Sequence, residues 1–174
     1  MFSIKQATTK DCATIHDLAS RIWSHTYNSI LAPDQLDYMF DMMYAPQNIL
    51  EQMNELKHLY FIISKNGTPA GYLSIEQKAD DLYNFQKIYS LPEVHGSGIG
   101  RYIIEQGIAY LKGIHPTPFT IELYVNRHNL AVGFYHHMGF QEIGTRDHAI
   151  GNGYYMNDYI LNLFVSDKDN EKTE

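Results

Sequence analysis

Residues 94–101 read V-H-G-S-G-I-G-R, and the interpretation of the whole chain begins from this stretch. Glycines alternate with other residues at positions 96, 98 and 100, so the backbone can turn sharply and a ligand can approach it closely. Apolar residues then recur at helical spacing and predict a helix over 99–112 with one buried face: Ile99, Ile103, Ile104, Ile108 and Leu111. A flexible loop that leads into a helix N-terminus presents unpaired N–H groups and the positive end of the helix dipole, which predicts an anion-binding site.

Two common phosphate-binding motifs are excluded by the residues around this loop. A mononucleotide P-loop ends in Gly-Lys-Ser/Thr, whereas Arg101 and Tyr102 follow Gly100 here. The dinucleotide fingerprint G-x-G-x-x-G fails because its last position would be Arg101 or Ile103. The loop is therefore either a site for the pyrophosphate of another cofactor or an ordinary glycine-rich turn before a core helix. This stretch alone does not distinguish between the two.

The composition is typical of one globular domain. The chain has 174 residues, of which 44% are hydrophobic and 19% charged. We expect a single domain over residues 1–166, followed by a disordered acidic tail over 167–174. No apolar run approaches the ~20 residues of a membrane span, and the N-terminus lacks the features of a signal peptide. The sequence therefore predicts a cytoplasmic protein that does not bind a membrane.

The net charge, the single cysteine and the histidines limit the kinds of partner and site that this chain can have. The formal net charge of −7 argues against nucleic acid, which needs a basic surface, and it is compatible with a cationic small substrate. Cys12 is the only cysteine, so no internal disulfide can form, and its apolar helical position predicts a buried side chain. The nine histidines form no H-E-x-x-H pattern, so we expect no metal.

Periodicity and turn signals predict one α/β domain in which strands alternate with helices. A strand over 3–7 precedes a helix capped by Thr8 or Thr9, and Pro33 opens a second helix. The remaining expected elements are a helix over 46–56, strands over 59–64, 70–77 and 82–90, the helix over 99–112, a strand over 119–125, a helix over 130–137, and strands over 140–145 and 154–164.

A second cluster of informative residues covers 126–140 and reads N-R-H-N-L-A-V-G-F-Y-H-H-M-G-F. Asn126 follows a strand, where its amide can bond local backbone, and Asn129 either caps the next helix or faces the amide groups of a ligand. Phe134 is predicted to lie in the core, so the adjacent Tyr135 is expected to point elsewhere. A phenol at the inner end of a cleft can donate a proton, but Tyr135 could equally be a packed tyrosine with a bonded hydroxyl.

Together the two segments resemble the GNAT superfamily of acyl-CoA-dependent N-acyltransferases. The resemblance rests on H-G-S-G-I-G after the strand F-Q-K-I-Y-S, and on the segment 126–140. It implies the GNAT fold: an α/β (α+β) domain with a mixed, mostly antiparallel central sheet that splays after strand 4 and has helices on both faces. It also implies acetyl-CoA as co-substrate and a set of cofactor-binding residues: Ile88, Tyr89, Ser90, His95, Gly96, Ser97, Gly98, Ile99, Gly100, Arg101, Asn129 and Tyr135. His95 departs from the Gln or Arg that usually opens the loop of this family.

Two further stretches resemble bacterial acetyltransferases of the spermidine/spermine (polyamine) type. They are W-S-H-T-Y-N-S-I-L-A-P-D-Q-L-D-Y-M from Trp23 and Y-Y-M-N-D-Y-I-L from Tyr154. This resemblance implies a primary amine as acceptor, such as a polyamine or a similar small cationic amine. Related proteins with the same motifs need not share a substrate.

Acyl transfer to an amine requires a neutral amine, a polarised thioester and a proton for the departing thiolate. Direct attack in a ternary complex needs no protein nucleophile, and backbone N–H near Tyr89 could polarise the carbonyl. We expect Tyr135 to act as general acid, and Glu76 or Glu122 to accept the amine proton, with Tyr124 as a further candidate.

Three alternatives concern the substrate and the assembly. The chain could acetylate a protein or peptide N-terminus, which needs an open groove, or it could be a catalytically silent CoA-binding sensor. A homodimer could form if the tyrosine-rich strand over 154–164 is an edge strand that pairs with a second copy.

Overall fold

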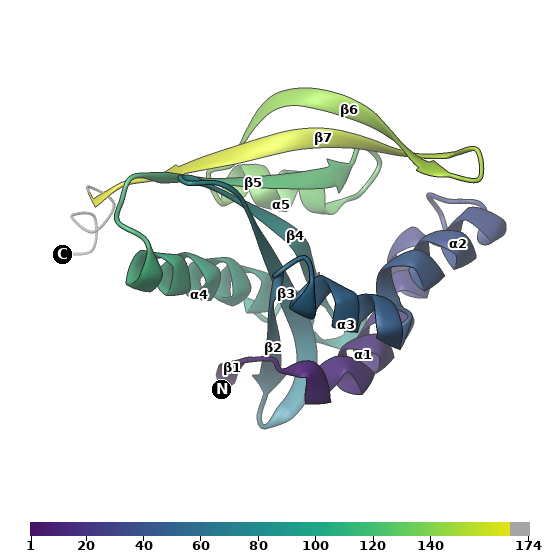
Figure 1. The fold of residues 1–174 in the computed structure, drawn as a ribbon, viewed down its shortest axis with the longest axis horizontal. Helices are drawn as coiled ribbons and strands as arrows, with labels where there is room; N and C mark the ends of the chain where they lie inside the picture. The colour runs from purple at the N-terminus through teal and green to yellow at the C-terminus, as the bar shows by residue number, and fades with distance from the viewer. Residues whose placement is uncertain (168–174) are drawn as a thin grey trace. The chain divides into compact units, whose positions relative to one another are not determined.

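The computed structural model describes residues 1–167, which fold into the expected alternation of strands and helices (Figure 1). The strands are β1 (Phe2–Gln6), β2 (Leu59–Lys65), β3 (Thr68–Ala79), β4 (Leu82–Ser90), β5 (Phe119–Asn126), β6 (Gln141–Gly151) and β7 (Tyr154–Val165). The helices are α1 (Cys12–Tyr27), α2 (Pro33–Tyr44), α3 (Pro46–Asn54), α4 (Ile99–Ile114) and α5 (Ala131–His137), with short 3-10 helices η1 (Thr9–Asp11) and η2 (Pro92–Val94). Of the predicted acidic tail, residues 168–174 lie outside the described part of the chain.

Within residues 1–167 the strands form one seven-stranded sheet in the order β1-β2-β3-β4-β5-β7-β6. The pairs β1–β2, β2–β3, β5–β7 and β6–β7 are antiparallel. β4 and β5 are parallel and pair over Leu82–Asn84 and Thr120–Glu122. This mixed, mostly antiparallel sheet confirms the predicted fold class.

The chain forms two compact units, and β3, β4 and α4 each contribute residues to both. Unit 1 consists of residues 1–76 and 86–107, and unit 2 of residues 77–85 and those from 108 onward. The glycine loop therefore belongs to unit 1, and the segment 126–140 belongs to unit 2.

The N-terminal helices of unit 1 begin where local chemistry places them. Thr8 and Asp11 form a capping box, in which Asp11 Oδ2 accepts from the Thr8 amide at 2.8 Å. Pro33 and Pro46 occupy the first turns of α2 and α3, where the missing N–H of proline costs no hydrogen bond. Helices α1, α2 and α3 pack against one another, and Cys12 is buried as expected.

The core of unit 1 contains a cluster of aromatic side chains among its aliphatic residues. We refer to Trp23, Tyr27, Tyr44, Tyr72 and Tyr89 as the aromatic cluster. Tyr44 is its centre, because its hydroxyl accepts from Trp23 Nε1 at 3.0 Å and from the Tyr72 hydroxyl at 2.7 Å. The hydroxyls of Tyr27 and Tyr89 lie 2.8 Å apart. Large rings thus fill the core while their polar atoms bond one another, as buried polar groups require.

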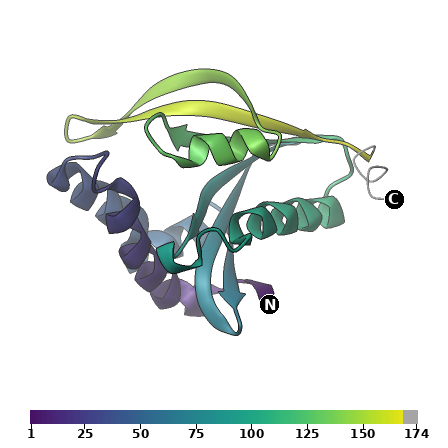
Figure 2. The same cartoon turned by 180° about the vertical axis from the view of Figure 1, so that it is seen from behind.

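Unit 2 is built around the strands β5, β6 and β7, with α5 on one face of β5 and β7 (Figure 2). β6 is longer than predicted and runs to Gly151 rather than to about Thr145. Its second half, R-D-H-A, lacks apolar alternation, but its backbone pairs with β7, as in Arg146 opposite Asp158. The connecting turn shortens to Asn152-Gly153, both with positive φ.

The expectation that residues 154–164 form an edge strand is wrong. β7 pairs with β5 on one side and β6 on the other, so β6 is the edge of the described sheet. The reason is topological, since the chain returns from β6 through a tight turn and places β7 inside the sheet.

Candidate functional site

The glycine loop of unit 1 is an exposed turn with left-handed backbone at two positions. Gly96 and Gly98 have φ of +75° and +88°, which glycine adopts without the penalty that a Cβ would bring. A Cβ built on either glycine would meet no atom within 4 Å. The space over the loop is therefore open, so a ligand can contact the backbone there.

Helix α4 begins at Ile99, directly after this turn. The first intrahelical bond is donated by Tyr102 N to Gly98 O at 3.1 Å, so the amides of residues 99–101 precede the hydrogen-bonded ladder. Ile99 is buried and faces the core. Arg101 is exposed, and its Nη1 lies 3.6 Å from Oε1 of Glu105. The helix start thus offers backbone N–H donors and the positive end of a helix dipole, which suits a phosphate group.

His95 connects this loop to the end of β4. Its Nε2 lies 3.1 Å from the carbonyl oxygen of Ser90, and its ring lies 6.4 Å from that of His25. Because a carbonyl oxygen can only accept a hydrogen bond, Nε2 of His95 must be protonated and donate to it. The sequence could not predict this contact, which gives the atypical first residue of the loop a structural role.

The end of β4 passes unusually close to β3. A Cβ on Gly71 would lie 2.6 Å from the carbonyl oxygen of Tyr89 and 3.3 Å from Cβ of Ser90. Ile88, Tyr89 and Ser90 are half-buried, and Leu91 N donates to Ala70 O at 2.9 Å. Gly71 therefore permits the close approach of the β4 backbone at the residues for which the family resemblance implies cofactor pairing.

Glu76 lies on β3 and is half-buried in unit 1. Its Oε2 accepts a hydrogen bond from the Gln86 side chain and lies 3.9 Å from Nε2 of His58. It is five residues from Gly71, so the strand separates it from the Tyr89 contact by roughly 16 Å. A proton from an amine near Tyr89 would reach Glu76 only through intervening water.

In unit 2, the two asparagines of the second cluster bond local backbone as predicted. Asn126 Oδ1 accepts from His128 N, and Asn129 Oδ1 accepts from Ala131 N at the start of α5, both at 2.9 Å. Asn129 precedes the N-cap residue Leu130, so its oxygen is engaged in a local turn rather than in a helix cap. Its amide nitrogen is the group that could donate to a ligand.

The expected arrangement of Phe134 and Tyr135 is reversed. Tyr135 is buried at 7% exposure, whereas Phe134 is half-buried. The Tyr135 ring lies edge-to-face on Phe140 at 5.9 Å, and Phe140 N donates to Tyr135 O where Gly139 ends the helix. The turn after α5 folds Phe140 back onto the side of the helix that carries Tyr135, which helical periodicity alone could not indicate.

Glu122 and Tyr124 lie on the more exposed side of β5, as predicted. Asn84 Nδ2 donates to Glu122 Oε1 at 2.9 Å. The Tyr124 ring is covered by the Arg146 guanidinium, 3.5 Å from the ring centroid, and the Nζ of Lys78 lies 6.0 Å away. Both candidate bases are therefore held by neighbouring polar groups of unit 2.

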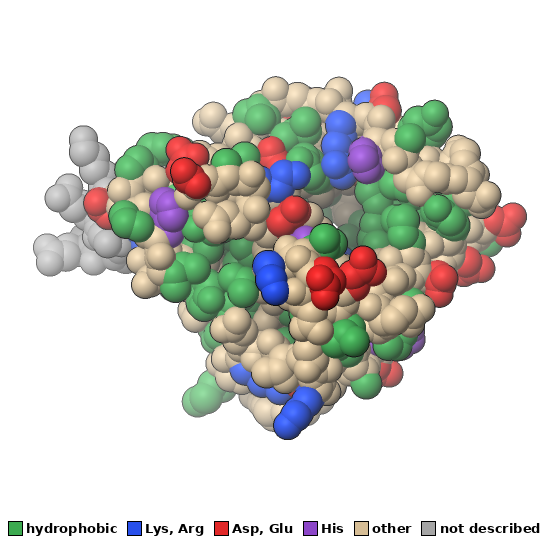
Figure 3. Space-filling view, viewed as in Figure 1, with side chains coloured by type: hydrophobic (Ala, Val, Ile, Leu, Met, Phe, Trp, Pro, Cys, Tyr) green, Lys and Arg blue, Asp and Glu red, His purple; other side chains and the backbone are tan. Residues whose placement is uncertain are grey.

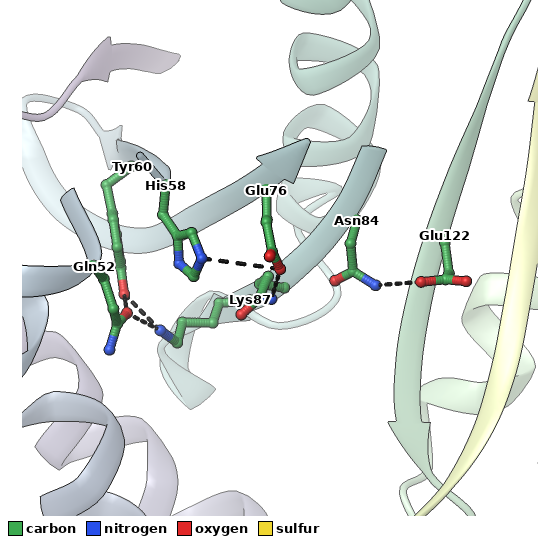
Figure 4. A network of polar contacts seen from close by, with 8 residues as sticks. Gln52, His58, Tyr60, Glu76, Asn84, Lys87 and Glu122 are labelled. Atoms are coloured by element: carbon green, nitrogen blue, oxygen red, sulfur yellow. Dashed lines mark hydrogen bonds and ion pairs between the residues drawn. The ribbon is translucent and has the colours of Figure 1, made fainter. Parts of the chain in front are cut away.

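Sequence reasoning missed Lys87, a buried lysine in unit 1 (Figure 4). Its Nζ donates to Gln52 Oε1 at 2.5 Å and to the Tyr60 hydroxyl at 2.6 Å. Burial lowers its pKa to about 7. The signal in the sequence was a lysine inside a strand otherwise rich in buried residues, Y-N-F-Q-K-I-Y.

Residues 1–167 contain neither a metal-ligand cluster nor a membrane-spanning helix. No three His, Cys, Asp or Glu side chains in this part of the chain converge as a metal site would require. None of its helices has the length and apolar character needed to cross a bilayer.

Residues 57–142 match the family described as Acetyltransferase (GNAT) domain. A comparison with curated protein sequences finds no match.

Several solved structures share the fold at low sequence identity. One is PaiA N-acetyltransferase from Thermoplasma acidophilum in complex with coenzyme A, with a TM-score of 0.68, 18% identity, and coverage of 93% of this chain and 98% of that chain. The ribosomal-protein-S18-alanine N-acetyltransferase from Escherichia coli has a TM-score of 0.70 at 20% identity, and the alignment covers 95% of each chain. The spermidine/spermine N-acetyltransferase SpeG from Vibrio cholerae has a TM-score of 0.65 at 19% identity, covering 94% of this chain and 95% of that chain. The family match over residues 57–142 and the solved structures together show that this chain has the GNAT fold.

Proposed function

We propose that this chain is an acetyl-CoA-dependent N-acetyltransferase that transfers an acetyl group to a primary amine by direct attack in a ternary complex. The observation that carries the proposal is the open glycine loop at the start of α4, where Gly96 and Gly98 leave room above an exposed backbone. The CoA bound to the structurally similar PaiA enzyme supports the same ligand for this fold.

The residues of the loop fit the cofactor. The pyrophosphate carries negative charge, and the backbone amides at the start of α4 supply donors without a bulky side chain in the way. Ile88, Tyr89 and Ser90 offer half-buried strand backbone for the pantetheine arm, and Asn129 offers its amide nitrogen. When bound, acetyl-CoA supplies the acetyl group as a reactive thioester.

The proton transfers are assigned to side chains of this chain. Tyr135 gives its phenolic proton to the sulfur, and burial restricts the motion of its ring. Glu76 or Glu122 takes the proton that the attacking amine loses, and the transfer to Glu76 runs through water. No nucleophilic side chain is required, which agrees with the burial of Cys12.

The acceptor is a small cationic amine such as a polyamine. Helix α2 carries Asp34, Asp37 and Asp41 on its exposed side and contains no Lys or Arg. Figure 3 shows acidic side chains where Figure 1 places this helix. An acidic surface attracts polycations and raises their local concentration. The fold shared with SpeG from Vibrio cholerae supports the same substrate class.

A thiol-release assay with acetyl-CoA tests the proposal. The acceptor panel contains spermidine, spermine, amino acids, aminoglycosides and short peptides, and polyamines are expected to give the highest kcat/KM. A preference for peptides would instead indicate acetylation of a protein or peptide N-terminus; the structurally similar Escherichia coli enzyme is named for a protein substrate, ribosomal protein S18. Binding of CoA without turnover of any amine would favour a silent sensor and refute the proposed activity.

A further inference from the structure

Lys87 is the feature of unit 1 that the proposed chemistry does not use. It is 6% exposed, and the Nζ lies over the rings of Tyr44 and Tyr60, 5.2 Å and 5.1 Å from their centroids. Among residues 1–167, no carboxylate lies within ion-pair distance of this Nζ. A buried cation without a carboxylate partner opposes folding, and an apolar side chain of similar volume would avoid that cost.

The hydrogen bonds of Lys87 connect three elements. Its two acceptors are Tyr60 on β2 and Gln52 on α3, and the Tyr60 hydroxyl also donates to Gln52 Oε1 at 2.5 Å. The three side chains form a closed triangle that ties β4 to its neighbours (Figure 4). Hydrogen bonds from a charged donor are shorter and about twice as strong as neutral ones, which agrees with these distances.

The triangle lies next to the backbone that the proposed function assigns to the cofactor. Lys87 directly precedes Ile88, Tyr89 and Ser90. Beyond it, Gly71 permits the close contact of β3 with Tyr89, and His95 binds the Ser90 carbonyl. The segment 88–90 is thus fixed on one side by Lys87 and on the other by the loop.

We propose that Lys87 is a positioning residue whose buried ammonium holds β4 at the place where residues 88–90 pair with the pantetheine arm of CoA. The inference rests on the proposed function and adds a residue that does not touch the cofactor. It predicts that breaking the triangle weakens CoA binding and leaves the chemical step largely intact.

Protonation of Lys87 supplies a readout that a purely structural role would lack. Its pKa of about 7 means that the amine is mostly charged at pH 6 and mostly neutral at pH 8.5. The neutral amine loses a donor and the attraction to the Tyr44 and Tyr60 rings, so the anchor weakens as the pH rises. CoA affinity is therefore expected to fall across this range.

Other titratable groups lie near Lys87, and their contribution to the pH dependence of CoA binding must be separated from that of Lys87. Tyr44 at the end of α2, Tyr60 on β2 and Cys12 on α1 have raised pKa values because of burial, so they stay neutral at these pH values. His16 on α1 bonds the Tyr44 carbonyl, and His58 pairs with Glu76. The variants His16→Gln and His58→Gln are therefore included as controls for the pH response.

Isothermal titration with CoA at pH 6.0 and 8.5 tests the inference without an acceptor amine. Lys87→Met is expected to weaken CoA binding about tenfold at pH 6.0 and much less at pH 8.5, by the strength of one charge-assisted bond. Comparing variant with wild type at each pH cancels the ionisation of CoA itself. Lys10→Met, at an exposed lysine of η1, is the matched control and is expected to bind as wild type.

Two further variants keep the inference refutable if Lys87→Met does not fold. Tyr60→Phe and Gln52→Leu each remove one hydrogen-bond acceptor of Lys87. Both are expected to weaken CoA binding, as Lys87→Met does, but by a smaller factor. Steady-state kinetics should show a raised KM for acetyl-CoA with kcat within about threefold of wild type.

The outcomes separate the two proposals. If the wild type does not bind CoA, the proposed function fails and the inference fails with it. If the wild type binds CoA but the triangle variants bind equally well at both pH values, only the inference is overturned. A loss of kcat with unchanged KM, or a pH response that disappears in His58→Gln or His16→Gln, also overturns it.

Discussion

Replacing Gly71 by alanine isolates the contact between β3 and the proposed cofactor-pairing segment. The new Cβ would lie 2.6 Å from the Tyr89 carbonyl oxygen, where ordinary contact begins at 3.4 Å. The obstructing atom is backbone, so it cannot swing away as a flexible side chain would. Either β3 or β4 must therefore move by roughly 0.8 Å.

A displacement of that size is expected to impair both catalysis and stability. Misplacement of reacting groups by about 1 Å can cost on the order of 10²-fold in rate, so kcat/KM for acetyl-CoA should fall about 10- to 100-fold. This corresponds to about 1.4–2.7 kcal/mol of lost transition-state stabilisation. Overpacking should also lower the free energy of unfolding by about 1–3 kcal/mol.

The assay combines thiol-release kinetics with urea denaturation of Gly71→Ala and a matched control. The control is Gly113→Ala, because a Cβ at this position in α4 meets nothing within 4 Å. Alanine is the better helix former, so this variant should be as active as wild type and up to about 1 kcal/mol more stable. If Gly71→Ala keeps kcat/KM within twofold of wild type, the close approach at Tyr89 does not matter for the reaction.

Three further predictions follow from particular residues. Tyr135→Phe should lower kcat by about 10²- to 10⁴-fold while CoA affinity by titration stays within threefold, and unchanged turnover would remove Tyr135 from the mechanism. Gly98→Ala places a Cβ on a backbone with φ of +88°, where the new Cβ meets no other atom. The variant should therefore lower the free energy of unfolding, measured by urea denaturation, by about 1–2 kcal/mol and should weaken CoA binding. An unaffected variant would show that the left-handed turn is not needed. Because burial lowers the Lys87 pKa to about 7, the unfolded chain binds more protons between pH 7 and the ordinary lysine value, and stability should rise with pH there by up to about 1.4 kcal/mol per unit. Lys87→Met should abolish that slope, and its persistence in the variant would assign it to another group.

Local patterns in the sequence determined most of the strands, the helices and the glycine-rich turn before α4. Pro33 and the Thr8–Asp11 capping box mark helix starts, and Asn66-Gly67 with positive φ forms the predicted hairpin turn. These features depend on neighbours a few residues apart, so they can be inferred without a tertiary fold. The same holds for the open loop at Gly96 and Gly98, which needs only residues that tolerate left-handed backbone.

Sequence patterns failed where long-range pairing decides the outcome. Periodicity placed Phe134 in the core, but the returning chain at Phe140 buries Tyr135 instead. Strand β7 was expected at an edge because its tyrosines resemble an exposed surface, whereas pairing with β5 and β6 puts it inside the sheet. Neither strand order nor the packing partner of a ring is encoded in local spacing.

By itself, the sequence determined that this chain has a glycine-rich turn feeding a helix within an alternating α/β framework, because backbone conformation and periodicity are local properties. Only the tertiary structure showed how that turn is held. His95 reaches the Ser90 carbonyl, Gly71 admits the Tyr89 backbone, and Lys87 meets Tyr60 across the core. The contacts of Gly71 with Tyr89 and of Lys87 with Tyr60 join residues distant in sequence, so their energies depend on a fold that spacing alone cannot supply.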